Sequence, residues 1–257
     1  TVTRIANVSS DNFQLKLQNP GDLTTPTTRD VFYLVVEEGN WTLPDGRSLE
    51  AQKYNSTQTD AKNDWTPTGQ NYLSSYTNPV VLGQVMTHND SQWSTFWASD
   101  GTQAGEPSSL SLSTGKHVGE DTTTSRNHEA MGFVVTEEGH GTIGDAEYDF
   151  FLSSESVEGV VESPPYYEQY SAPFSSTPQL GIVSPAGFNG GDGGWMVTYV
   201  DFNTTHIRLG LDEDQISDDD REHIQENVAV FAFDQSGSYI DNQPGNITGP
   251  RFNTTQI

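Results

Sequence analysis

Short apolar runs, separated by turn-forming residues, recur along the whole chain. Residues 13–17 alternate apolar and polar side chains with the two-residue period of a half-buried strand. Other runs are rich in β-branched and aromatic residues and are bounded by Gly, Asn, Asp or Pro, at residues 31–36, 80–85, 131–135, 195–200 and 228–233. No stretch longer than ten residues keeps a clear helical period. The pattern therefore predicts an all-β fold.

One order of sequence features occurs twice in the later part of the chain. Residues 79–85 (Pro-Val-Val-Leu-Gly-Gln-Val) are similar to residues 178–183 (Pro-Gln-Leu-Gly-Ile-Val). In each copy an aromatic run follows, at residues 93–97 and 195–199, and then an acidic loop, an Arg, a His, a Glu and an apolar run. Copies of this size predict tandem antiparallel β-sandwich modules.

A first copy precedes these two. Residues 33–39 (Tyr-Leu-Val-Val-Glu-Glu-Gly) match residues 133–139 (Phe-Val-Val-Thr-Glu-Glu-Gly). This copy lacks the opening Pro-Val-Val run, because Thr1 falls after the place where that run would end. We therefore expect a first module without its opening strand, two further modules and a tail, over residues 1–77, 78–165, 177–241 and 242–257.

The C-terminal tail alternates its side chains after a Gly-Pro turn, as a strand does. A module that lacks a strand leaves a sheet edge unpaired, and such edges accept strands from other chains. We predict that the tail donates a strand to the first module of the next copy and so builds a head-to-tail homopolymer. The predicted donor residues are Phe252, Thr254, Gln256 and Ile257. The alternative is that the same strand closes the first module of its own chain.

The charge of the chain excludes several kinds of partner. The 257 residues carry 36 acidic and 11 basic side chains, for a formal net charge of −25. Such a field repels nucleic acid and anionic lipid. It favours solubility and cation binding, and a halophilic source would explain it equally well. The chain has no Cys and no run of 18 apolar residues, so we expect neither disulfides nor membrane insertion, and the start at Thr1 fits a processed mature chain.

Seven Asn-X-Ser/Thr sequons indicate an extracellular or cell-surface glycoprotein with covalently attached glycans. The predicted N-glycosylation sites are Asn7, Asn40, Asn55, Asn89, Asn203, Asn246 and Asn253. The alternative is that a Thr-rich β-protein acquires sequons by chance.

The acidic loop of the last copy is the candidate metal site. Ca²⁺ takes about six to eight oxygen ligands, which clustered carboxylates on a loop can supply. The predicted ligands are Asp212, Glu213, Asp214 and Asp218. No EF-hand spacing is present, so the alternative is a solvated acidic loop whose charge Arg126 or Arg221 balances locally.

No catalytic residues are predicted. A nucleophile elbow, a phosphate loop and a His-Glu-X-X-His motif are all absent from the sequence. Glu129 and Glu226 could pair with His128 and His223 for acid–base chemistry. The grouping recurs in tandem copies, however, as an architectural feature would. A buried Glu held by Arg or by backbone N–H groups explains it with fewer assumptions.

Several stretches resemble a repeat module of large secreted and surface proteins of planctomycetes and other aquatic microbes. The resemblance runs from Thr1 to about Phe233 and is carried by residues 3–5, 17–20, 35–41, 79–90, 115–121 and 190–195. It implies a secreted or surface location. The order of His, Glu and a following apolar strand also resembles H-type lectins, which are six-stranded sugar-binding sandwiches.

These observations lead to three hypotheses for function. The first is a non-enzymatic structural subunit of an extracellular assembly, such as a filament, flagellar hair, sheath or surface layer, with copies of itself as partners. The second is a calcium-assisted carbohydrate-binding or adhesion protein of the lectin type, in which exposed aromatic side chains bind sugars. The third is a polysaccharide-degrading enzyme.

Overall fold

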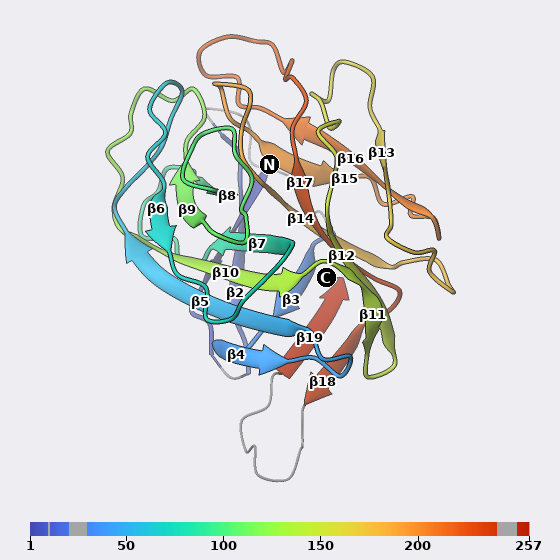
Figure 1. The fold of residues 1–257 in the computed structure, drawn as a ribbon. Coiled ribbons are helices and arrows are strands. Elements are labelled where there is room, and N and C mark those ends of the chain that lie inside the picture. The colour runs from blue at the N-terminus through green and yellow to red at the C-terminus, as the bar shows by residue number, and fades with distance from the viewer. Residues whose placement is uncertain (10, 21–29, 241–250, 257) are drawn as a thin grey trace.

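The computed structural model describes residues 1–9, 11–20, 30–240 and 251–256 and is all-β, as the sequence predicts. These residues form 19 strands in six antiparallel sheets (Figure 1). No helix is present among them, and accordingly none that is long and apolar enough to cross a membrane.

Seven consecutive strands form a complete β-sandwich, here called sandwich 1. One sheet has the order β4-β5-β10-β7 and the other the order β6-β9-β8. Its core contains Phe96, Met131, Phe133 and other buried side chains from both sheets. The strands are β4 (Gly39–Thr42), β5 (Ser48–Ser56), β6 (Thr68–Gln70), β7 (Pro79–Val85), β8 (Thr95–Ser99), β9 (Leu112–His117) and β10 (Glu129–Glu137).

The next seven strands repeat this arrangement as sandwich 2. The sheet orders β11-β12-β17-β14 and β13-β16-β15 match those of sandwich 1 strand for strand. Phe151, Ile207 and Val230 are among the residues of its core. The strands are β11 (Gly139–Ile143), β12 (Ala146–Leu152), β13 (Tyr166–Gln169), β14 (Leu180–Pro185), β15 (Trp195–Thr198), β16 (His206–Asp212) and β17 (Val228–Phe233).

A further sheet, here called the closing sheet, combines strands from the N-terminal and C-terminal parts of the described chain. It has the order β18-β19-β3, so that β19 (Arg251–Gln256) lies between β18 (Gly237–Ile240) and β3 (Phe32–Val35) (Figure 1). A separate antiparallel pair joins β1 (Val2–Ala6) to β2 (Gln14–Gln18). The C-terminal strand thus pairs with β3 of its own chain.

The sheets combine strands from different predicted sequence modules. Sandwich 1 joins β5, in the predicted range 1–77, to β10, in the range 78–165. Sandwich 2 joins β12, in the range 78–165, to β17, in the range 177–241. Each sandwich begins at the Gly of the repeated Glu-Glu-Gly sequence, which lies inside a predicted module and not at its boundary.

That Gly has a conformational reason to recur. Gly39 and Gly139 open β4 and β11, and their φ angles are +147° and +139°. Side chains rarely tolerate this region, whereas Gly adopts it readily. A Cβ at Gly39 would also lie 2.7 Å from the Trp41 ring. The repeated Glu-Glu-Gly sequence therefore marks the place where the chain leaves one strand and starts the next sandwich.

A central core joins the two sandwiches and the closing sheet. Leu49 and Val80 come from sandwich 1, whereas Phe150 and Phe231 come from sandwich 2. Residues of the closing sheet, including Leu34, pack against them. In β17, Phe231 and Phe233 face this central core, whereas Val228, Val230 and Ala232 face the core of sandwich 2. Residues 228–233 form an unbroken apolar run because both faces of the strand are buried.

Candidate functional site at the junction of the two sandwiches

Glu129 and Glu226 hold the same kind of loop in the two sandwiches. The Glu129 carboxylate accepts hydrogen bonds from the backbone N–H groups of Asn89 and Asp90, at 3.1 and 2.9 Å. The Glu226 carboxylate accepts them from Asn189 and Gly190, at 2.8 and 2.7 Å. Each loop follows an edge strand, β7 in sandwich 1 and β14 in sandwich 2. The edge strand pairs with the strand that begins at Glu129 or shortly after Glu226, which is β10 or β17. The recurrence of this Glu therefore has a structural explanation.

Each Glu has a different cationic partner. Arg4 of β1 lies 2.5 Å from Glu129, and both side chains are fully buried. His223 Nε2 lies 2.7 Å from Glu226. His128, the other candidate for an acid–base pair, is exposed, and its backbone carbonyl accepts a hydrogen bond from Asn89.

His223 is enclosed between two carboxylates. Its Nδ1 contacts Glu213 and its Nε2 contacts Glu226, and all three side chains are almost completely buried. Burial opposes protonation of the imidazole, but the hydrogen bonds to Glu213 and Glu226 raise the pKa of His223 to about 9. Burial raises the pKa of Glu213 to about 7, against the hydrogen bond from His223. A proton is therefore held at neutral pH within this buried group of side chains.

The acidic loops of the two sandwiches meet beside this histidine. The backbone N–H of Glu120 donates to Asp214, at 3.0 Å. Lys62 Nζ bridges Glu120 and Asp192, at 2.6 and 2.5 Å. Burial raises the pKa of Asp214 to about 6, against the hydrogen bonds from the backbone N–H groups of Glu120 and Ile216. Lys62 and Glu120 of sandwich 1 thus contact Asp192 and Asp214 of sandwich 2, next to the packed rings of Trp93 and Trp195.

The four predicted metal ligands do not converge on one point. Asp212 pairs with Arg221 at 2.6 Å, and Glu213 contacts His223. Asp214 accepts from the backbone of Glu120 and Ile216, whereas Asp218 accepts from Asp220 N at 3.2 Å. Across residues 1–9, 11–20, 30–240 and 251–256, no group of three or more His, Asp or Glu side chains is arranged to hold a metal ion. Arg126 pairs with Asp121 at 2.8 Å. Local charge balance by Arg126 or Arg221 is what the alternative to a metal site predicts.

Adding a chelator is therefore expected to leave the stability of the chain unchanged. The carboxylates of the acidic loops are engaged by Arg221, His223 and backbone N–H groups, so the folded state gains no ion that EDTA would remove. The measurement is the midpoint of thermal unfolding with EDTA or with CaCl₂, at constant ionic strength. A midpoint that rises with CaCl₂ and falls with EDTA would contradict this expectation.

The sequons that the structure describes lie at the surface. The side chains of Asn7, Asn40, Asn55 and Asn89 are exposed, and that of Asn203 is partly exposed. Asn203 Oδ1 accepts from both the backbone and the hydroxyl of Thr205, at 2.8 Å each. Asn246 lies outside the described residues, and the strand of Asn253 is described without its side chain. Glycan attachment at the seven sites stays a prediction.

The predicted donor strand forms β19 and lies within its own chain. Thr254 pairs with Leu34 and Gln256 with Phe32, both in β3. Phe252 pairs with Tyr239 of β18, and Ile257 lies outside the described residues. This pairing corresponds to the alternative in which the tail closes the first module of the same chain.

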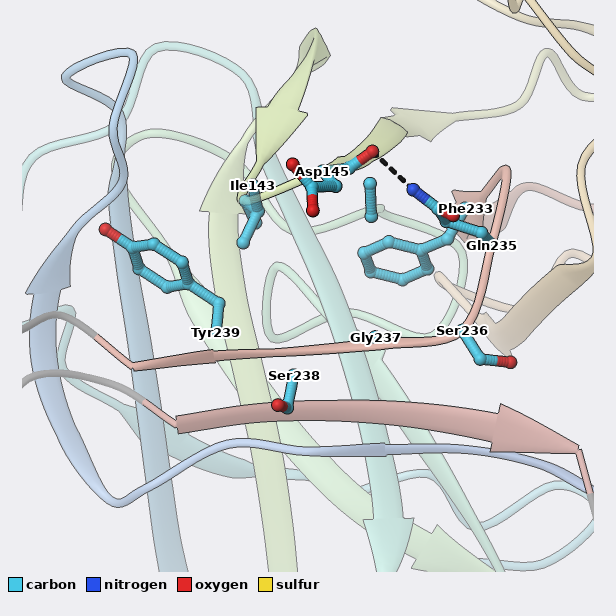
Figure 2. A pocket seen from close by; sticks show the side chains of 9 residues that line it. Ile143, Asp145, Phe233, Gln235, Ser236, Gly237, Ser238 and Tyr239 are labelled. Atoms are coloured by element: carbon cyan, nitrogen blue, oxygen red, sulfur yellow. Dashed lines mark hydrogen bonds between the residues drawn. The ribbon is translucent and has the colours of Figure 1, made fainter.

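A small pocket lies where β18 leaves sandwich 2. It has a volume of about 190 Å³ and is lined by residues that include Ile143, Phe233 and Tyr239. Figure 2 shows Gln235 donating from its amide to the backbone carbonyl of Asp145, at 2.5 Å. Asp145 provides the one carboxylate of the lining, so the pocket offers no pair of acids for glycoside cleavage.

Sequence reasoning missed two buried cations. Arg4 belongs to an alternating strand, but its carboxylate partner is 125 positions away in the sequence. Lys116 is also buried, and its Nζ donates to Gln58 O and Thr59 Oγ1, both at 2.7 Å. A signal existed for both: each basic residue occurs within a strand-like run of a chain with few basic residues.

Comparison with known proteins finds a similarity over almost the whole chain. Halomucin of Haloquadratum walsbyi is 24% identical over 260 aligned residues, which cover 99% of this chain. The chain spans about 2% of the length of that relative. No protein-family model matches the chain, and no solved structure matches it.

Proposed function

We propose that this chain is a non-enzymatic structural unit of an extracellular or cell-surface glycoprotein. The observation that carries the proposal is the similarity to Halomucin, which covers 99% of this chain but 2% of the relative. The name of that relative is that of a mucin, and a stretch of this size within a long protein fits a building unit. The buried acids support the same conclusion, because the carboxylates of Glu129 and Glu226 are buried and accept hydrogen bonds from the loop backbone.

We further propose that such units join head to tail by exchange of β19. In its own chain, β19 connects to the rest of the closing sheet through antiparallel pairing with β18 and β3. The β3 strand of a neighbouring copy offers the same partner surface, so β19 can pair there with the same register. A contact of this kind is heterologous and propagates into a filament. Salt would favour the assembly, because it screens the net charge of −25.

Deleting residues 251–257 is expected to abolish filaments while the two sandwiches stay folded. The experiment compares the full chain and the deleted chain by negative-stain microscopy at high salt, with circular dichroism to check folding. A matched control is a chain of full length with the substitutions Thr254→Pro and Thr255→Pro, since consecutive prolines remove N–H groups on both edges of the strand. Normal filaments from the deleted chain would overturn strand exchange.

The proposal does not extend to calcium-assisted sugar binding. Within the part of the chain that the structure describes, the acidic residues form no shared metal site. Covalent glycosylation belongs to the proposal through the exposed sequons, and mass measurement of the chain purified from its natural source tests it.

A further inference from the structure

The closing sheet has one strand fewer than the corresponding sheets of the two sandwiches. In the orders β4-β5-β10-β7 and β11-β12-β17-β14, the third strand is paired on both sides. By position β3 is the counterpart of β10 and β17, because the sequence Glu-Glu-Gly follows both β3 and β10. Among the described strands, however, β3 pairs with β19 alone. The position that β7 and β14 fill in the sandwiches has no described strand beside β3.

The packing around the central core indicates where this fourth strand would lie. β7 of sandwich 1 packs against β12 and β17 of sandwich 2. β14 of sandwich 2 packs in the same way against β3 and β19 of the closing sheet. Continuing the order, a strand beside β3 would pack against β5 and β10 of sandwich 1.

The exposure of β10 matches such an unfilled position. Every residue of β17 is buried, whereas Ala130, Gly132 and Val134 of β10 are partly exposed. The register of the sheets makes Val134 the counterpart of Phe231, since they pair with Ala51 and Phe150 respectively. Phe231 is fully buried in the central core, whereas Val134 packs against the edge of that core and stays partly exposed.

The neighbouring ion pair does not close this surface. Lys53, next to Ala51 on the same face, lies 2.9 Å from Glu38, and the two side chains are 63% and 57% exposed. Exposed pairs of this kind contribute little to stability, so an incoming strand can displace it at small cost.

We propose that the edge of β3 opposite β19 binds one β-strand supplied from outside residues 1–257, with the chemistry of β7 and β14. This inference deepens the proposed function by naming the partner segment, and it rests on that function. In β7, Val80 and Leu82 face the central core, and in β14 Leu180 faces it with Ile182 packed against it. The next position on that face is polar in both strands, Gln84 and Ser184, and Ser184 Oγ donates to Val81 O at 3.1 Å. The partner is thus an extended segment with two apolar residues and then a polar one at alternate positions.

Strand addition of this kind draws its affinity from main-chain hydrogen bonds and its specificity from the alternate side chains. The position beside β3 is distinct from the position of β19, which lies on the opposite edge. The site is therefore available whether β19 pairs within its chain or with a neighbour.

The test uses a synthetic peptide with the sequence of residues 78–86, added to the full chain at high salt. We expect saturable binding by fluorescence anisotropy and slower amide hydrogen exchange at residues 32–35. The control peptide carries proline in place of Val81 and Leu82. Adjacent N–H groups point to opposite edges, so one proline must remove a donor facing β3. We expect the control to bind at least about tenfold more weakly, a difference of about 1.4 kcal/mol.

Three outcomes would overturn the inference: no saturable binding, equal binding of the two peptides, or binding that leaves exchange at residues 32–35 unchanged. The peptide experiment does not require filaments. Filaments without peptide binding would therefore refute this site and leave the proposed function intact. Peptide binding without filaments would support this site and refute the head-to-tail assembly.

Discussion

Replacing Arg4 with alanine is expected to lower the free energy of unfolding by roughly 3–5 kcal/mol, as for the loss of one partner of a buried ion pair. The Arg4 guanidinium lies 2.5 Å from Glu129 and donates to Thr87 O at 2.8 Å and to Gln92 O at 3.3 Å. Alanine would leave the Glu129 carboxylate charged and buried without its cation. It would also remove the hydrogen bonds by which Arg4 joins the β1–β2 pair to the loop after β7. Urea unfolding at constant salt measures the change.

The matched control for Arg4 is Lys53→Ala. Lys53 also pairs with a carboxylate, but both side chains are more than half exposed. We expect a loss below about 1 kcal/mol, because water and salt screen such a pair. A double variant, Arg4→Met with Glu129→Gln, is expected to recover part of the stability, since no buried charge is then left alone. If Arg4→Ala proved as mild as Lys53→Ala, the ion pair would not hold the N-terminal strands to sandwich 1.

The sequence predicted the fold class because strand signals are local. Alternation, β-branched runs and bounding turns identified the strands around residues 13–17, 131–135 and 228–233 without knowledge of their partners. Which strands pair is not a local property. β5 and β10 are joined across most of sandwich 1, and β19 and β3 across most of the chain. From the sequence alone, pairing of the C-terminal strand within its own chain, as in the closing sheet, therefore stayed an alternative to pairing with another copy.

Aligning the repeats by their shared sequence motif also does not reproduce the positions of the residues in the strands. The Leu-Gly pairs of residues 82–83 and 180–181 coincide in sequence, but their strand positions differ. Gly181 lies opposite Ala232, whose counterpart in sandwich 1 is Val135. Val135 lies opposite Val81, so the two glycines are offset by two positions. The side-chain period of a strand is two, and a shift of two therefore keeps every side chain on the same face.

The candidate site was only partly predictable for a related reason. A run of carboxylates indicates a high charge density, but it does not say which of them are buried or what they accept. Glu213 and Asp214 are buried, whereas Asp218 is exposed, although all belong to one acidic stretch. Of the decisive partners, His223 lies in the same loop of sandwich 2 as Glu213, whereas the backbone of Glu120 comes from sandwich 1.

The contribution of His223 to the free energy of unfolding is expected to fall by about 3 kcal/mol as the pH rises from 6.5 to 9. Its folded pKa of about 9 exceeds the ordinary value of 6.5 in the unfolded chain. Below pH 6.5 the imidazolium forms in both states, and its contacts with Glu213 and Glu226 contribute fully. Above pH 9 the proton is lost from the folded state too, and the contribution is gone. Each pKa unit of difference corresponds to about 1.4 kcal/mol.

Other buried groups define the pH window in which His223 dominates. Glu213 and Asp214, with pKa values raised by burial to about 7 and 6, also lose stability with rising pH, but mainly below pH 7. Burial lowers the pKa of His117 to about 3, so its effect is a loss of stability as the pH falls below 6.5. Burial lowers the pKa of Lys116 to about 8, and its effect, a gain with rising pH, begins there. The slope between pH 7 and 8 therefore reports on His223.

A neutral substitution of the pair tests this assignment. The double variant His223→Gln with Glu213→Gln keeps polar side chains at both places but removes the titrating groups. We expect its free energy of unfolding to change little between pH 7 and 8, whereas that of the unmodified chain falls. His128→Gln is the matched control, because His128 is exposed and should leave the slope unchanged. An equal slope in all three proteins would mean that His223 is not the group whose titration lowers the stability between pH 7 and 8.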